Sequence, residues 1–90
     1  DDIKNDKIKL MAFPNPAVDK LSLVLNVDKT TDSRIIIYDE LGRQVEKEYF
    51  QRLYAGENLI EMNISNYLSG IYFVSLSIDG EMVVKQIIKE

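Results

Sequence analysis

Along two stretches of the sequence every second residue is apolar and most residues between them are polar, which predicts β-strands with one buried face. These stretches are residues 21–27 and 70–78. Residues 34–38 are apolar on both faces and rich in isoleucine, which predicts a strand in the centre of a sheet. Further short strands are expected at about residues 8–13, 43–51, 57–64 and 81–89.

The segments between these strands favour turns. Pro14-Asn15-Pro16 ends the first strand, because prolines remove backbone donors and bias the residues before them toward extended geometry. Residues 39–42 fit a type I turn with Gly42 at the position that needs a positive φ. This turn pairs Asp39 with Arg43 and makes the following strand an edge strand.

The turn before the last strand contains Asp79-Gly80. A two-residue loop there would pair Val74 with Lys85 and set the lysine on the core face, which is costly. We therefore predict a three-residue bulged loop over residues 78–80, which pairs Val74 with Val84 and turns Lys85 outward.

Seven short strands without a helical period predict an all-β fold, a seven-stranded antiparallel immunoglobulin-like β-sandwich. A half-open barrel is the alternative. Residues 1–9 carry three Asp and three Lys and are interpreted as a flexible linker from an upstream cargo domain, whereas residues 10–90 form the sandwich. Because the chain starts at Asp1 and not at Met, it is interpreted as a piece of a longer precursor.

Composition narrows the possible functions. Ninety residues, 46% of them hydrophobic, suffice for one core. The net charge is −4 and there is no run of basic residues, so no nucleic-acid partner is expected. The apolar runs are far shorter than the ~20 residues that cross a bilayer, so we expect no membrane span. Without cysteine or histidine, thiol nucleophiles, ordinary zinc sites and histidine acid–base chemistry are excluded, and we expect no enzyme, metal or cofactor.

Several side chains suggest specific roles. Residues 68–72 resemble a tyrosine corner, in which Tyr72 fills the core and its hydroxyl bonds back to the preceding crossover. Lys85 and Lys89 lie four residues apart and therefore project from one face of a strand. They guard an edge strand against aggregation or form a paired-cation handle for a receptor, and the spacing fits both.

Four groups of residues occur in a characteristic order. They are Phe13-Pro14-Asn15-Pro16-Ala17 with Asp19 and Leu21, Ile37-Tyr38-Asp39 with Leu41-Gly42-Arg43, Leu68-Ser69-Gly70-Ile71-Tyr72-Phe73-Val74, and the terminal Lys85 to Lys89. With these groups, residues 11–90 resemble the C-terminal sorting domain of proteins exported by the type IX (Por) secretion system of Bacteroidetes.

The resemblance implies a non-catalytic secretion signal. Such a domain follows a cargo protein, folds in the periplasm and is recognised by the outer-membrane translocon. A sortase-like protease then usually removes it, here within residues 1–9 or just upstream, and the cargo stays on the outer-membrane surface or outside the cell. The residues to which the resemblance gives recognition roles are Pro14, Asn15, Pro16, Ala17, Gly42, Arg43, Gly70, Tyr72, Lys85 and Lys89. Folding alone leaves the Pro14-Asn15-Pro16 corner and the two lysines unexplained, so we expect a receptor to contact these.

The alternative is an accessory β-sandwich that binds carbohydrate or mediates adhesion or dimerisation. Such a module needs an exposed aromatic platform, for which Tyr49, Phe50 and Tyr54 are the candidates. A weak dimer is compatible with either function.

Overall fold

The computed structural model describes residues 8–90, and this part of the chain forms seven β-strands and no helix. The strands are β1 (Leu10–Phe13), β2 (Lys20–Val27), β3 (Thr31–Asp39), β4 (Tyr49–Leu53), β5 (Gly56–Asn63), β6 (Gly70–Ile78) and β7 (Glu81–Lys89). The all-β prediction is confirmed, and each expected strand is present in its expected order. The expected linker falls mostly on residues 1–7, which lie outside the described residues.

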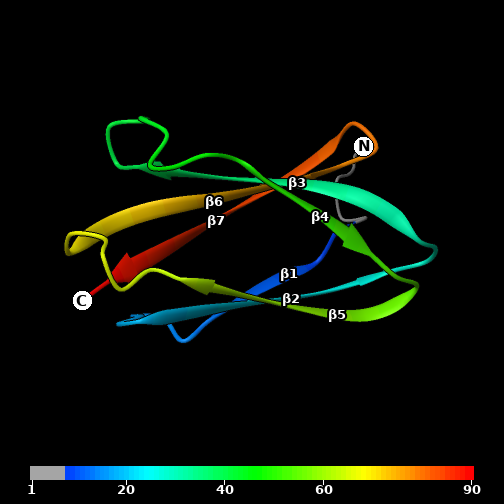
Figure 1. Cartoon of the computed structure of the whole chain (residues 1–90), viewed down its shortest axis with the longest axis horizontal. Coiled ribbons are helices and arrows are strands. Elements are labelled where there is room, and N and C mark those ends of the chain that lie inside the picture. Colours follow the sequence, from blue (N-terminus) through cyan, green and yellow to red (C-terminus); the bar gives the residue numbers. More distant parts are fainter. Residues whose placement is uncertain (1–7) are drawn as a thin grey trace, which may run out of the picture.

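The strands form two antiparallel sheets that face each other (Figure 1). One sheet has the order β1-β2-β5, and the other has the order β4-β3-β6-β7. This arrangement is consistent with an immunoglobulin-like sandwich. The isoleucine-rich strand β3 lies between β4 and β6, as its two apolar faces predict.

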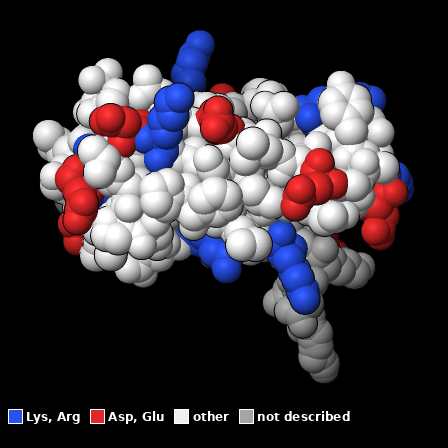
Figure 2. All heavy atoms as spheres, turned by 90° about the horizontal axis from the view of Figure 1, so that it is seen from below, with Lys and Arg blue, Asp and Glu red and all other residues white. Residues whose placement is uncertain are grey.

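Charged side chains are dispersed over the surface. In Figure 2, which views the molecule from below relative to Figure 1, acidic and basic residues stand among uncharged ones. All three arginines of the sequence pair with carboxylates, Arg34 with Glu48, Arg43 with Asp39 and Arg52 with Asp32. The face in Figure 2 therefore offers no broad basic surface to a polyanion.

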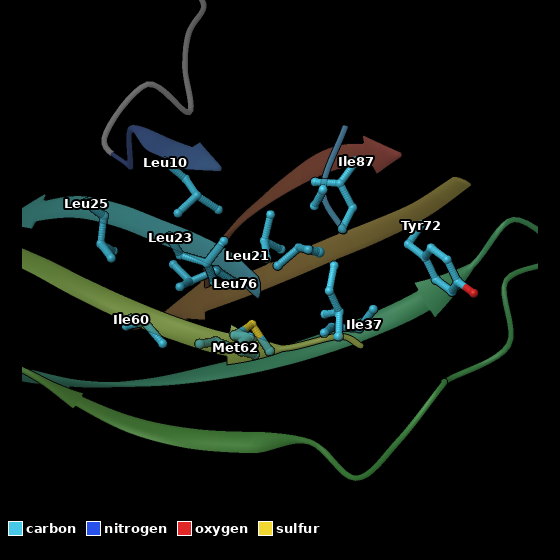
Figure 3. Packing of buried hydrophobic residues seen from close by; sticks show 14 of the residues in the cluster. Leu10, Leu21, Leu23, Leu25, Ile37, Ile60, Met62, Tyr72, Leu76 and Ile87 are labelled. Atoms are coloured by element: carbon cyan, nitrogen blue, oxygen red, sulfur yellow. The ribbon is translucent and has the colours of Figure 1, made fainter. Parts of the chain in front are cut away.

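The core lies between the two sheets, where alternate residues of each strand point inward (Figure 3). Alternation predicts inward positions for β2, β5 and β6, and all of these are buried except Val27 at the end of β2, which is half-buried. The buried residues are Leu21, Leu23, Leu25, Ile60, Met62, Tyr72, Val74, Leu76 and Ile78, with Ile64 just after β5. Burying an aliphatic side chain of this size is worth about 1.5–3 kcal/mol, so this layer holds the two sheets together.

The strand predicted at residues 43–51 is shifted toward the C-terminus. The backbone follows β3 only as far as Val45, whose N–H donates to the carbonyl of Ile37 at 2.8 Å. Beyond this point the Glu46 carboxylate accepts a hydrogen bond from Tyr67, which lies in the connection between β5 and β6. β4 begins only at Tyr49, and it is an edge strand as predicted, since it pairs with β3 alone.

The prediction of a bulged loop before β7 is wrong. Ile78 pairs with Glu81 across a two-residue turn, and Val74 pairs with Lys85. Asp79 and Gly80 have φ values of 49° and 81°, the two positive values that a type I′ hairpin turn requires. Lys85 is nevertheless exposed, because β7 is the edge of its sheet. The free-energy cost of burying a charged lysine, which was the reason for predicting a bulged loop, therefore does not arise.

Candidate recognition site at one end of the sandwich

Nine of the ten residues with expected recognition roles lie at one end of the sandwich. Strand pairing brings Asp39 beside Tyr72, and Gly70 beside Lys89. Ala17 forms a parallel bridge with Lys89. The turn after β3, the crossover before β6 and the end of β7 all lie at the left of Figure 1. We call this region the motif end and define it as residues 14–19, 39–45, 64–72 and 86–90.

The Pro14-Asn15-Pro16 corner binds the outer edge of β7. The side-chain amide of Asn15 donates to the carbonyl of Gln86 at 3.3 Å and accepts from the N–H of Ile88 at 2.9 Å. Ala17 continues this contact, since its N–H donates to the carbonyl of Ile88 and its carbonyl accepts from the N–H of Glu90, both at 2.8 Å. We call this contact between residues 15–17 and β7 the clasp.

The clasp corrects one sequence-based expectation. The corner has a role in folding. The Asn15 side chain pairs with β7 as a strand residue would, through two hydrogen bonds between uncharged groups, and so holds the last strand in place. Ala17 is fully buried beneath it, so a small side chain is required at that position. Direct contact of this corner with a receptor stays a prediction.

The turn after β3 is organised by Asp39. Its carboxylate accepts hydrogen bonds from the backbone N–H groups of Leu41 and Arg43 at 2.9 and 3.0 Å, and from the guanidinium Nε of Arg43 at 2.9 Å. The N–H of Arg43 is the main reason why the pKa of Asp39 is lowered. Gly42 has a φ of 83°, as the turn prediction requires. The turn thus holds the exposed Arg43 side chain in one orientation.

Tyr72 forms the predicted tyrosine corner. Its ring is buried, and its hydroxyl donates to the carbonyl of Leu68 at 2.6 Å. The ring of Tyr67 packs against it with centroids 5.1 Å apart. Burial, and then the hydrogen bond to Glu46, raise the pKa of the Tyr67 phenol above its usual range. Tyr72 therefore serves the fold, and its ring is not exposed to a partner.

Two exposed leucines flank a hollow between the turn after β3 and the crossover before β6. Leu41 is 74% exposed and Leu68 is 82% exposed. The hollow is lined by Asp39, Glu40, Leu41, Arg43, Leu68, Ser69, Gly70, Ile71 and Tyr72. Neither leucine is among the recognition residues expected from the sequence, although each lies next to a glycine-bearing turn, and this position is the signal that could have identified it.

The two lysines of β7 differ in their surroundings. Lys85 is exposed, lies opposite Val74 and is the one expected recognition residue outside the motif end. Lys89 is only 7% exposed, and its ammonium group donates to the carbonyl of Glu90 at 2.8 Å. The structure therefore does not present them as a pair of exposed cations.

The remaining candidate sites do not assemble. Within residues 8–90, no group of three or more acidic residues is placed to hold a metal ion. Phe50 and Tyr54 are exposed, but Tyr49 is half-buried near Glu46, so the three rings do not form one platform.

No helix in the described part of the chain is long and apolar enough to span a membrane.

Comparison with known protein families gives a match over almost the whole chain. A family model described as the secretion system C-terminal sorting domain matches residues 11–90, and this range contains the whole motif end. No curated protein matches the chain.

Proposed function

The chain belongs to the family of secretion system C-terminal sorting domains, and we propose that the secretion machinery recognises it at the motif end. Domains of this family are C-terminal sorting signals for type IX secretion. The chain therefore interacts with the secretion system and with a cargo, and it directs export to the cell surface or the extracellular space. Its family is not catalytic.

The observation that carries the proposal is the convergence of four separate segments on the end of the sandwich that lies away from the start of β1. Leu10 at the start of β1 pairs with Leu25, near the end of β2, whereas the clasp lies beyond the other end of β1. Ile8 lines a hollow together with Asp79 of the hairpin turn, so it lies at the end opposite to the motif end. A cargo joined upstream leaves the motif end uncovered.

The exposed side chains of the motif end indicate which groups a partner contacts. Leu41 and Leu68 offer apolar surface, and Arg43 offers a charge that Asp39 holds in place. Gly42, Gly70 and Tyr72 shape this surface without contributing large exposed groups to it. We assign this contact to the outer-membrane translocon. A sortase-like protease then cuts upstream, within residues 1–9 or before them, after transit through the periplasm.

The export test uses a reporter protein fused in front of residues 1–90 in a Bacteroidetes strain that has type IX secretion. The expected result is reporter on the cell surface or in the medium. Retention in the periplasm, while a known cargo is exported normally, would contradict the proposed function.

The contact at the motif end is tested by replacing both exposed leucines, Leu41→Ser with Leu68→Ser. Export should fall several-fold, whereas the free energy of unfolding should change by less than about 0.5 kcal/mol per substitution, because both side chains are exposed. The matched control is Leu59→Ser, which replaces an exposed leucine of β5 outside the motif end. Equal export of all variants would place the recognised surface elsewhere on the domain.

A further inference from the structure

The outer edge of β7 is covered along only half of its length. β7 pairs with β6 on one side, while the backbone groups of Gln86, Ile88 and Glu90 point to the other side and meet the clasp. Since this direction alternates along a strand, the N–H and C=O groups of Met82 and Val84 point the same way. These groups have no hydrogen-bond partner among residues 8–90, so within the described part of the chain this stretch of the edge is unpaired.

This open stretch differs from the other three edges of the sandwich. β1 is four residues long and is followed by Pro14, β5 exposes Glu57 and Glu61, and β4 has five residues with an exposed Arg52. Charges, prolines and short length are the usual means by which an edge avoids pairing with another chain.

β7 lacks most of these protections. It pairs with β6 over nine consecutive residues without a bulge. Its outward-facing side chains Met82 and Val84 are apolar and are 62% and 48% exposed. Lys85 is its one exposed charge near the open stretch. The edge is therefore suited to binding another strand.

We propose that an extended segment of a partner protein adds to the four-stranded sheet along residues 82–85. Its backbone would bond to the outward N–H and C=O groups of Met82 and Val84. Its alternate side chains would be apolar where they lie beside Met82 and Val84, and an acidic side chain would lie near Lys85. The clasp occupies the edge from Gln86 onward, so it limits the added strand to about four or five residues and fixes its register.

This contact rests on the proposed function but uses a surface separate from the leucines of the motif end. The strand addition gives Lys85 a role in recognition, as the partner of an acidic side chain, although Lys85 lies outside the motif end. It also explains how a long apolar edge can remain in a folded domain, because the partner covers it during export.

The first test is amide hydrogen exchange of the isolated domain, followed by NMR. The amides of Val83 and Lys85 should exchange slowly because they bond to β6, and those of Met82 and Val84 should exchange fast. Slow exchange at Met82 and Val84 in the isolated domain would show that the edge is already occupied and would overturn the proposal.

The second test measures export of the reporter fusion carrying Val84→Pro. Proline removes the outward N–H while leaving the bonds to β6 in place, and export should fall about tenfold. Val84→Thr keeps the N–H and is the control, with export close to wild type. Because Val84→Pro can also impair folding, Val84→Lys serves as a second variant. It replaces the apolar side chain against which the added strand packs, without removing any backbone group.

The outcomes separate the two proposals. Normal export of both Val84→Pro and Val84→Lys overturns the strand addition while leaving the proposed function intact. Retention of the unsubstituted fusion in the periplasm contradicts the proposed function itself. If sedimentation shows a dimer that Val84→Lys abolishes without reducing export, the edge binds a second copy of this chain and the proposal is wrong.

Discussion

Asn15 shows how one side chain can act as a piece of backbone. Its amide group carries a donor and an acceptor, as a peptide unit does, and it uses the donor on Gln86 and the acceptor on Ile88 of β7. The two flanking prolines cannot donate hydrogen bonds themselves, so the side chain supplies the pairing at this point. A residue that looks like a receptor contact in the sequence is thus a structural connection.

Replacement of Asn15 by Asp separates its two hydrogen bonds. The carboxylate can accept from Ile88 but cannot donate to Gln86, and it faces that carbonyl with a negative charge. We expect a loss of about 1–2 kcal/mol in the free energy of unfolding, measured by urea denaturation at pH 7. Asn63→Asp is the control, because Asn63 only accepts hydrogen bonds, from Ser65. Equal stability of both variants would show that the donation to Gln86 contributes nothing.

The Asp39 carboxyl gives the turn after β3 a defined pH dependence. Its pKa is lowered from 3.8 in the folded state, so its contribution to stability is complete above that value and is lost as the pH falls through the folded pKa. An NMR titration should show this pKa below 3.8 in the wild type. In Arg43→Gln it should rise part of the way back, because the backbone N–H donors remain. An unchanged pKa in Arg43→Gln would mean that the guanidinium has no influence.

At the scale of the element, alternation predicted the strands well and their register less well. The inward residues of β2, β5 and β6 follow directly from the sequence, because a strand with one buried face must alternate. The register of β7 does not, because a lysine on the inward face need not be buried when its strand lies at the edge of the sheet. Only the position of β7 at the sheet edge shows that Lys85 reaches solvent.

The turn between β6 and β7 leads to a test of this register. Gly80 has a φ of 81°, and a Cβ atom added there would meet no atom within 4 Å. Gly80→Ala should therefore cost about 1–2 kcal/mol of stability through backbone strain alone, measured by thermal or urea unfolding. Asp79→Asn should change stability by less than about 0.5 kcal/mol, because asparagine also tolerates a positive φ. A neutral Gly80→Ala would contradict the type I′ turn.

At the scale of the whole molecule, the core and the motif end depend on each other. The motif end consists of four segments that are held together by β2, β3, β6 and β7, and these strands pack through the shared core. The free energy of unfolding of such a domain is only about 5–15 kcal/mol. A substitution that disrupts core packing therefore also separates the four segments of the motif end.

Leu23→Ala tests this dependence, since Leu23 is fully buried between the sheets. We expect a loss of about 3 kcal/mol in the free energy of unfolding. Far-ultraviolet circular dichroism follows the strands, and the NMR signals of the packed rings of Tyr67 and Tyr72 follow the motif end. Both signals should shift together in one transition, whereas Leu59→Ala on the surface should shift neither. Separate transitions would show that the motif end unfolds independently.

The sequence pattern predicted the order of the strands, most of their inward residues, the turn at Gly42 and the tyrosine corner, because each depends on neighbouring residues and local backbone geometry. It did not predict that β4 begins only at Tyr49. The ordered motifs of the sequence also indicated the family. Tertiary structure alone decided that Asn15 binds β7, that Lys89 is buried while Lys85 is exposed, and that Leu41 and Leu68 flank one hollow. These features join residues far apart in the sequence, and their contacts are fixed only when the two sheets pack.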